Sequence, residues 1–137
     1  MDGSKVNNIV RIPTSLYGNF YRLWLEFLAP FHNLTSREMD IAAAFLKHRQ
    51  ELSEVIKDPD LLEKVVMGED TKRSIREECK VTVAHFQIIM GKLRKSKIIV
   101  DGKINPKFVP KNLSSDSNSF RLLLYFDLDG KRDKKTL

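Results

Sequence analysis

Residues 82–97 read TVAHFQIIMGKLRKSK and carry the strongest structural pattern in the chain. The apolar residues that recur at the spacing of one helical face, and would be buried, are Phe86, Ile89, Met90 and Leu93. Thr82 can cap the start of this helix, because its hydroxyl can accept a hydrogen bond from a backbone N–H that lacks a helical partner. The pattern therefore predicts an amphipathic helix over residues 82–95 that ends in basic residues.

The segments on either side of this helix extend the pattern. A second helix is expected over residues 72–79, followed by a short break. After the basic helix, residues 98–100 and 103–109 read as two extended segments joined by a turn at Asp101 and Gly102. A helix, a short turn, a basic helix and a hairpin form the layout of a winged helix-turn-helix.

Over residues 34–109 the chain resembles the winged helix-turn-helix DNA-binding family. The residues at the offsets typical of that family are Val81, Thr82, Phe86, Met90, Leu93 and Ile99. Lys97 departs from the pattern, because the family usually has glycine there and the position tends to need a positive φ. A residue with a Cβ loses roughly 1 kcal/mol or more in that conformation, so we expect either a different helix end or mild strain at Lys97. The N-terminal stretch is similar to small proteins of tailed bacteriophages that infect gut bacteria.

Basic residues are concentrated near the same helix. Residues 91–111 contain seven basic side chains and one acidic side chain, a local charge of +6 that equals the formal net charge of the whole chain. A local field of this kind is typical of proteins that bind the phosphate backbone of nucleic acid. The alternative is an ordinary solvated lysine-rich surface, but the coincidence with the helix-turn-helix order favours nucleic acid.

The totals suit one domain over residues 1–137. The chain is 42% hydrophobic and 31% charged, as in an ordinary soluble globular protein, and is long enough for one core. Its only cysteine, Cys79, excludes an internal disulfide framework. Cys79 fits the role of a small buried hydrophobic residue better than that of a redox sensor.

The N-terminal part is the most aromatic region of the chain. Residues 9–12 read as a short strand that stops at Pro13, and residues 16–31 read as a helix that Pro30 would end. Its rings belong to Tyr17, Phe20, Tyr21, Trp24, Phe27 and Phe31. They could cover the core of a small domain, or they could form the surface of a homodimer.

The remaining elements complete a mostly helical α+β fold with a winged helix-turn-helix core. Thr35 and Glu38 have the spacing of a capping box and predict a helix that ends after Gln50. Residues 51–68 look like an insertion that contains a short helix beginning at Pro59. Residues 120–128 alternate in the period of a strand, for which residues 9–12 are a candidate partner. Residues 130–137 form a charged tail that we expect to be loose.

No residue pattern indicates catalysis. The three histidines, His32, His48 and His85, lack the neighbours of a metal site or a catalytic triad, and the glycines form no phosphate-binding loop. We therefore expect no enzymatic activity, no metal and no cofactor. The first residues lack the pattern of a signal peptide, and no apolar run is long enough to span a membrane. These features favour the cytoplasm, or the host cytoplasm if the protein is viral.

The resemblance implies a sequence-specific double-stranded DNA-binding protein, a transcriptional regulator of phage or bacterial origin, whose basic helix enters the major groove. The residues expected to contact bases are Val83, Ala84, His85, Gln87 and Ile88. The residues expected to contact phosphates are Lys72, Arg73, Thr82, Lys92, Arg94, Lys95, Lys97 and Lys103, with Arg76 also within reach. The alternative is a winged-helix protein–protein interaction module in a phage assembly or replication complex, because the exposed face of the basic helix is partly apolar.

Overall fold

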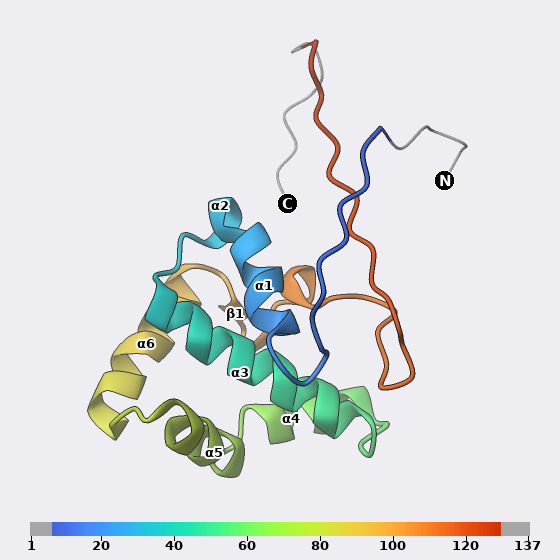
Figure 1. Cartoon of the computed structure of the whole chain (residues 1–137). Coiled ribbons are helices and arrows are strands. Elements are labelled where there is room, and N and C mark those ends of the chain that lie inside the picture. Colours follow the sequence, from blue (N-terminus) through green and yellow to red (C-terminus); the bar gives the residue numbers. More distant parts are fainter. Residues whose placement is uncertain (1–6, 130–137) are drawn as a thin grey trace.

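The computed structural model describes residues 7–129, and it confirms a mostly helical α+β chain with a small antiparallel sheet. The elements in chain order are α1 (Phe20–Phe27), α2 (Ala29–His32), α3 (Ser36–Ser53), α4 (Pro59–Val66), α5 (Glu69–Cys79), α6 (Val83–Lys95), β1 (Ile99–Val100), β2 (Lys103–Ile104) and the 3-10 helix η1 (Pro106–Phe108). Figure 1 shows α3 crossing the middle of the helical body. The body is therefore organised around α3, which packs against α1, α4, α5 and α6.

The start of α3 is specified locally by the predicted capping box. The backbone N–H of Glu38 donates to the Thr35 hydroxyl at 3.3 Å, and the backbone N–H of Thr35 donates to the Glu38 carboxylate at 2.9 Å. Each bond satisfies an N–H that the helix itself cannot pair. The inner face of α3 then contributes Ile41 and Phe45 to the core.

The core joins α3 to the helices that follow it. Phe45 of α3 and Phe86 of α6 are both fully buried, with ring centroids 6.3 Å apart. Ile75 of α5 and Val66 of α4 are also fully buried. The region interpreted as an insertion therefore supplies part of the core, since α4 packs against both α3 and α5.

The aromatic N-terminal helix is shorter than predicted and is divided in two. Residues 16–19 form a turn, α1 begins at Phe20, and Pro30 lies in the first turn of α2 instead of ending a helix. Proline is tolerated there because the N–H that it lacks would have no helical partner. Tyr21 and Trp24 are buried, which confirms that these two rings cover the core, whereas Tyr17, Phe27 and Phe31 are exposed.

The hairpin is also shorter than predicted. Ile99 pairs with Ile104 and Val100 with Lys103, and the second strand ends at Ile104 instead of Val109. Pro106 follows, has no N–H to donate to a ladder, and begins η1, where the Asn105 side chain accepts from the backbone N–H of Lys107 at 3.0 Å.

The predicted strands over residues 9–12 and 120–128 are not formed within the described part of the chain. Figure 1 shows both segments extending out of the helical body without strand arrows. Alternating apolar residues are not enough for a strand, which also needs hydrogen bonds to a neighbouring chain segment. The predicted loose tail, residues 130–137, lies outside the described residues. Between residues 7 and 129, no helix is both long and apolar enough to cross a membrane.

Candidate nucleic-acid interface

The position of α6 is set by its first turn and by the bend that precedes it. The backbone N–H of His85 donates to the Thr82 hydroxyl at 3.2 Å, which confirms the predicted cap. Lys80 ends α5 with a φ of 55°, in the left-handed region. The Arg37 guanidinium of α3 donates to the carbonyl oxygens of Cys79 and, at 3.2 Å, of Lys80. These bonds hold α6 at a defined angle to α5.

One face of α6 is buried and the other is open. The buried residues are the four predicted from their spacing, Phe86, Ile89, Met90 and Leu93. All five residues predicted to contact bases, Val83, Ala84, His85, Gln87 and Ile88, are exposed. Val83 and Ile88 are 59% and 63% exposed, which is unusual for large apolar side chains on a helix that also contributes to a core. The helix therefore presents a surface that is rich in apolar groups and includes one amide side chain.

Basic residues continue this surface at the C-terminal end of α6 and in the hairpin. The exposed members are Lys92, Arg94, Lys95, Lys97 and Lys103. Within residues 7–129, none of these five side chains takes part in a salt bridge. In the described part of the chain, these five side chains therefore form no direct ion pair that would compete with a phosphate.

The hairpin tip has the predicted turn, and Lys97 has the positive φ that was one of the two expected alternatives. The φ of Lys97 is 71°, so the position where the family resemblance expects glycine does have a positive φ. Asp101 and Gly102 have φ values of 55° and 72°, as in a two-residue hairpin turn whose twist suits antiparallel strands. The Asn105 side chain donates to the carbonyl oxygen of Lys97 at 2.9 Å and so connects the helix end to the hairpin.

Helix α5 contributes less to this surface than expected. Arg76 is engaged within the fold, because its guanidinium donates to the Glu69 carboxylate at 2.6 Å and lies over the Phe86 ring at 5.3 Å from the centroid. Arg73 is exposed and lies 3.4 Å from an Asp70 carboxylate oxygen. Lys72 is half-buried. The hydrogen bond from Arg76 lowers the pKa of Glu69 below its ordinary value.

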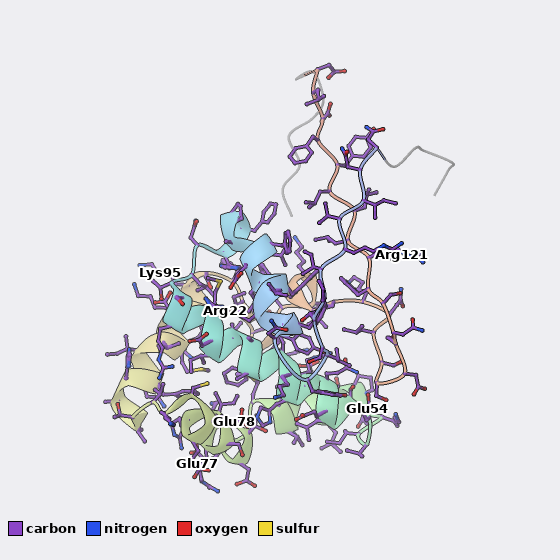
Figure 2. All side chains as sticks on the ribbon, viewed as in Figure 1. Arg22, Glu54, Glu77, Glu78, Lys95 and Arg121 are labelled. Atoms are coloured by element: carbon purple, nitrogen blue, oxygen red, sulfur yellow. The ribbon has the colours of Figure 1, made fainter. Side chains whose placement is uncertain are left out.

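Acidic residues border this surface on two sides: Glu77 and Glu78 on α5, and Asp60 and Glu63 of α4 beside Lys103 of the hairpin. Figure 2 shows Glu77 and Glu78 on α5 and Lys95 at the end of α6 that is remote from α5. Glu78 binds His48 of α3, whose Nε2 lies 2.8 Å from its carboxylate. Positive charge is therefore most concentrated at the C-terminal end of α6, where Lys92, Arg94 and Lys95 lie.

Sequence reasoning missed two features next to the surface. Arg37 gave no signal, because the carbonyl groups that it binds come from residues 42 and 43 positions later. An open hollow of about 480 Å³ lies between α2 and the base of the hairpin, where Phe31 and Phe108 help to line it. No local pattern could have found the hollow, since it exists only where two distant segments meet.

The titratable residues show no catalytic arrangement in the part of the chain that the structure covers. His32 is buried, with Nδ1 accepting from the backbone N–H of Leu34 at 3.0 Å and Nε2 lying 2.7 Å from the carbonyl oxygen of Leu25. Burial raises the pKa of the half-buried Cys79 thiol, which disfavours the reactive thiolate. Among residues 7–129, no three His, Cys, Asp or Glu side chains are grouped so that they could hold a metal ion.

Comparison of the chain with protein-family models, with curated proteins and with solved structures found no match. The resemblance to winged-helix regulators therefore stays a prediction that depends on the residues quoted above. What the chain can bind has to be argued from the surface of α6 and the hairpin.

Proposed function

We propose that the protein binds double-stranded DNA in a sequence-specific manner through α6 and the adjoining hairpin. The observation that carries the proposal is the continuity of two surfaces. The open face of α6, which ends in Lys92, Arg94 and Lys95, is followed directly by Lys97 and by Lys103 of the hairpin. A face suited to base edges is thus bordered by cations suited to phosphates.

The exposed face of α6 has the composition required for reading bases. An α-helix fits the major groove of B-form DNA, where each base pair presents a distinct pattern of donors, acceptors and methyl groups. Gln87 can bond an adenine through both its donor and its acceptor, and Ala84 or Ile88 can contact a thymine methyl group. Val83 and His85 lie in the first turn of the same face.

The basic residues would position the protein on the duplex. Lys92, Arg94 and Lys95 continue from the reading face of α6, and Lys97 and Lys103 extend the cationic surface into the hairpin. Contacts from such side chains to phosphates fix register and orientation but carry little sequence information. The resemblance to winged-helix proteins further favours a transcriptional regulator, of phage or bacterial origin, that acts in the cytoplasm and has no enzymatic activity.

The proposal is tested by fluorescence anisotropy of a labelled mixed-sequence duplex, titrated with the protein across a range of salt concentrations. We expect micromolar or tighter binding at low salt and a steep loss of affinity as salt rises. Lys92→Ala should weaken binding to all duplexes alike and reduce the salt slope by about one unit. Lys57→Ala is the matched control, because it removes the same charge from the α3–α4 connection, at the end of α3 remote from α6 in Figure 1. Equal effects of the two variants, or no binding at low salt, would contradict the proposal.

Sequence readout needs a separate experiment. After selection of a preferred duplex from a random pool, Gln87→Ala should change the preferred base at one position and leave the salt slope unchanged. Gln50→Ala removes the same amide from the far end of α3 and serves as the control. An unchanged preference in the Gln87 variant would remove this residue from direct base recognition.

The exposure of Val83 and Ile88 favours a second candidate function, a protein–protein interaction module. A partly apolar helix face can dock into a groove of another protein, and the acidic residues of α5 border its N-terminal end. The two functions differ in their dependence on salt. Double-stranded DNA binding is lost steeply as salt rises, whereas an apolar interface keeps most of its affinity.

A further inference from the structure

The segment that follows the hairpin leaves the helical body at Phe120. The Phe120 ring packs edge-on against Trp24 and Phe20 of α1, with centroids 5.5 Å and 5.4 Å away. Beyond this anchor the segment extends away from the body, as Figure 1 shows, and its large apolar side chains are exposed. Tyr125 and Leu128 are 81% and 90% exposed. Such a concentration of exposed apolar side chains indicates a surface that binds a partner.

The sequence of this segment is chemically self-complementary. Residues 120–128 read FRLLLYFDL, and the pattern is symmetric about Leu124. When two copies run antiparallel with Leu124 opposite Leu124, Arg121 of each copy lies opposite Asp127 of the other. All other opposed residues are apolar on both sides. Opposite charges and large apolar side chains are favourable cross-strand pairs, so in this register every residue of the segment lies opposite a favourable partner.

The same register keeps the two faces of the pair distinct. Residues at even-numbered positions lie on one face of both copies, because side chains alternate along a strand. These residues are Phe120, Leu122, Leu124, Phe126 and Leu128. The two copies together therefore form one continuous apolar face, and a shift of one residue would destroy both this face and the charge pairing.

Residues 9–12 are the segment that would supply the outer strands of such a pair. Two strands alone are marginally stable in water, whereas three or more with an apolar face are stable. Ile9 and Val10 are exposed, and Figure 1 shows that this segment extends from the body on the same side as residues 120–129. Pro13 and Arg11 suit an edge position, since both discourage the addition of a further strand.

We propose that residues 120–128 pair in antiparallel fashion with the same segment of a second copy of this chain, in register about Leu124, and that residues 9–12 of each copy flank the pair. The occupant is a second copy because the charge pattern is complementary to itself. Segment 9–12 of the same chain has Arg11 but no acidic residue, so it cannot reproduce both charge pairs. This dimerisation does not depend on the proposed DNA binding.

The first test measures the mass of the full chain by analytical ultracentrifugation. We expect a species of twice the 15.9 kDa of one chain. Arg121→Glu and Asp127→Arg, each alone, place like charges opposite each other twice in the dimer and should raise the dissociation constant about tenfold or more. A mixture of the two variants should restore dimers, because each mixed pair again unites an arginine with a carboxylate.

The second test measures the register by disulfide formation. Leu124→Cys in a Cys79→Ser background places two thiols directly opposite each other, so mild oxidation should link two chains. Leu128→Cys in the same background is the control, because its two thiols would lie about 27 Å apart along the pair. Both positions lie in the exposed extended segment, and thermal unfolding of each variant checks that the helical body is intact.

Each outcome either supports or overturns the pairing. A chain that stays monomeric at every concentration overturns the proposed pairing. Residues 120–128 would then bind either segment 9–12 of their own chain or another protein. A dimer that tolerates both charge reversals and forms no Leu124→Cys link also overturns it, and would move the interface to another surface, such as the exposed rings of Phe27 and Phe31. A wild-type dimer, heterodimers of the mixed charge variants, and a disulfide at Leu124→Cys but not at Leu128→Cys would together establish the antiparallel register.

Discussion

Trp24 of α1 donates a 2.8 Å hydrogen bond from its indole Nε1 to the backbone carbonyl oxygen of Phe108, 84 residues later in the chain. Both groups are buried, so neither can exchange this bond for one to water. The bond joins the N-terminal helix to the end of η1, just after the hairpin. The candidate interface is therefore supported by a part of the chain that does not belong to it.

Trp24→Phe should destabilise the protein by about 1–3 kcal/mol, because the carbonyl of Phe108 would stay buried without a donor. The free energy of unfolding in urea measures the change. Phe27→Leu is the control on the same helix, since its side chain is exposed and should change stability by less than about 0.5 kcal/mol. Similar values for the two variants would show that the indole bond contributes little.

Lys97→Gly should stabilise the fold although it removes a charge from the interface. The φ of 71° is unfavourable for a residue with a Cβ, and glycine removes that strain while gaining freedom in the unfolded chain. We expect a net gain of about 0.5–1 kcal/mol in the free energy of unfolding. Lys97→Ala removes the same charge but keeps the Cβ, so it should show no such gain. If both variants are equally stable, the backbone at Lys97 is not strained.

Gly91→Ala should also stabilise the protein, by about 0.5–1 kcal/mol, because alanine is the better helix former. A Cβ added at Gly91 would have no neighbour within 4 Å, so nothing in the fold opposes the substitution. Ala84→Gly in the same helix should have the opposite effect on the melting temperature. A Gly91 variant that is more stable but binds DNA less well would show that the ligand approaches the backbone of α6 closely.

The ion pair of Glu69 and Arg76 predicts a dependence of stability on pH. The pKa of Glu69 is lowered in the folded protein by the hydrogen bond from Arg76. Its stabilising contribution is therefore fully present above the ordinary glutamate pKa and is lost as pH falls through the lowered value. Glu69→Gln should reduce the melting temperature near neutral pH but have little effect in strong acid. Asp70→Asn on the same turn is the control, and an equal loss at every pH would contradict the prediction.

The features that the sequence predicted correctly are those that depend on neighbouring residues. The caps at Thr35 and Thr82 and the turn at Asp101 and Gly102 each follow from a few adjacent positions. The buried face of α6 follows from the 3.6-residue period alone. These interactions are complete within one element, so no knowledge of the tertiary structure was needed.

The wrong predictions concern features that depend on distant partners or on an uncertain boundary. The strands over residues 9–12 and 120–128 were inferred from the alternation of apolar and polar residues. Alternation indicates which side chains would share one face of a strand, but it does not show that a neighbouring segment is present to form the hydrogen bonds. Arg76 was expected to be within reach of a phosphate strand, on a helix predicted to begin at residue 72. The helix begins at Glu69, and this earlier start places the carboxylate two turns before Arg76, where it binds the guanidinium.

The hydrogen bonds from Arg37 make the orientation of α6 depend on a residue of α3. Because Arg37 belongs to α3 and binds the carbonyl groups of Cys79 and Lys80 where α5 ends, the bend between α5 and α6 is maintained by a residue outside the bend. Substitutions within the bend itself can then be tolerated as long as its carbonyl groups stay in place. Loss of the Arg37 guanidinium would instead change the angle between α5 and α6. The exposed face of α6 would then point in a different direction, although Arg37 does not belong to that face.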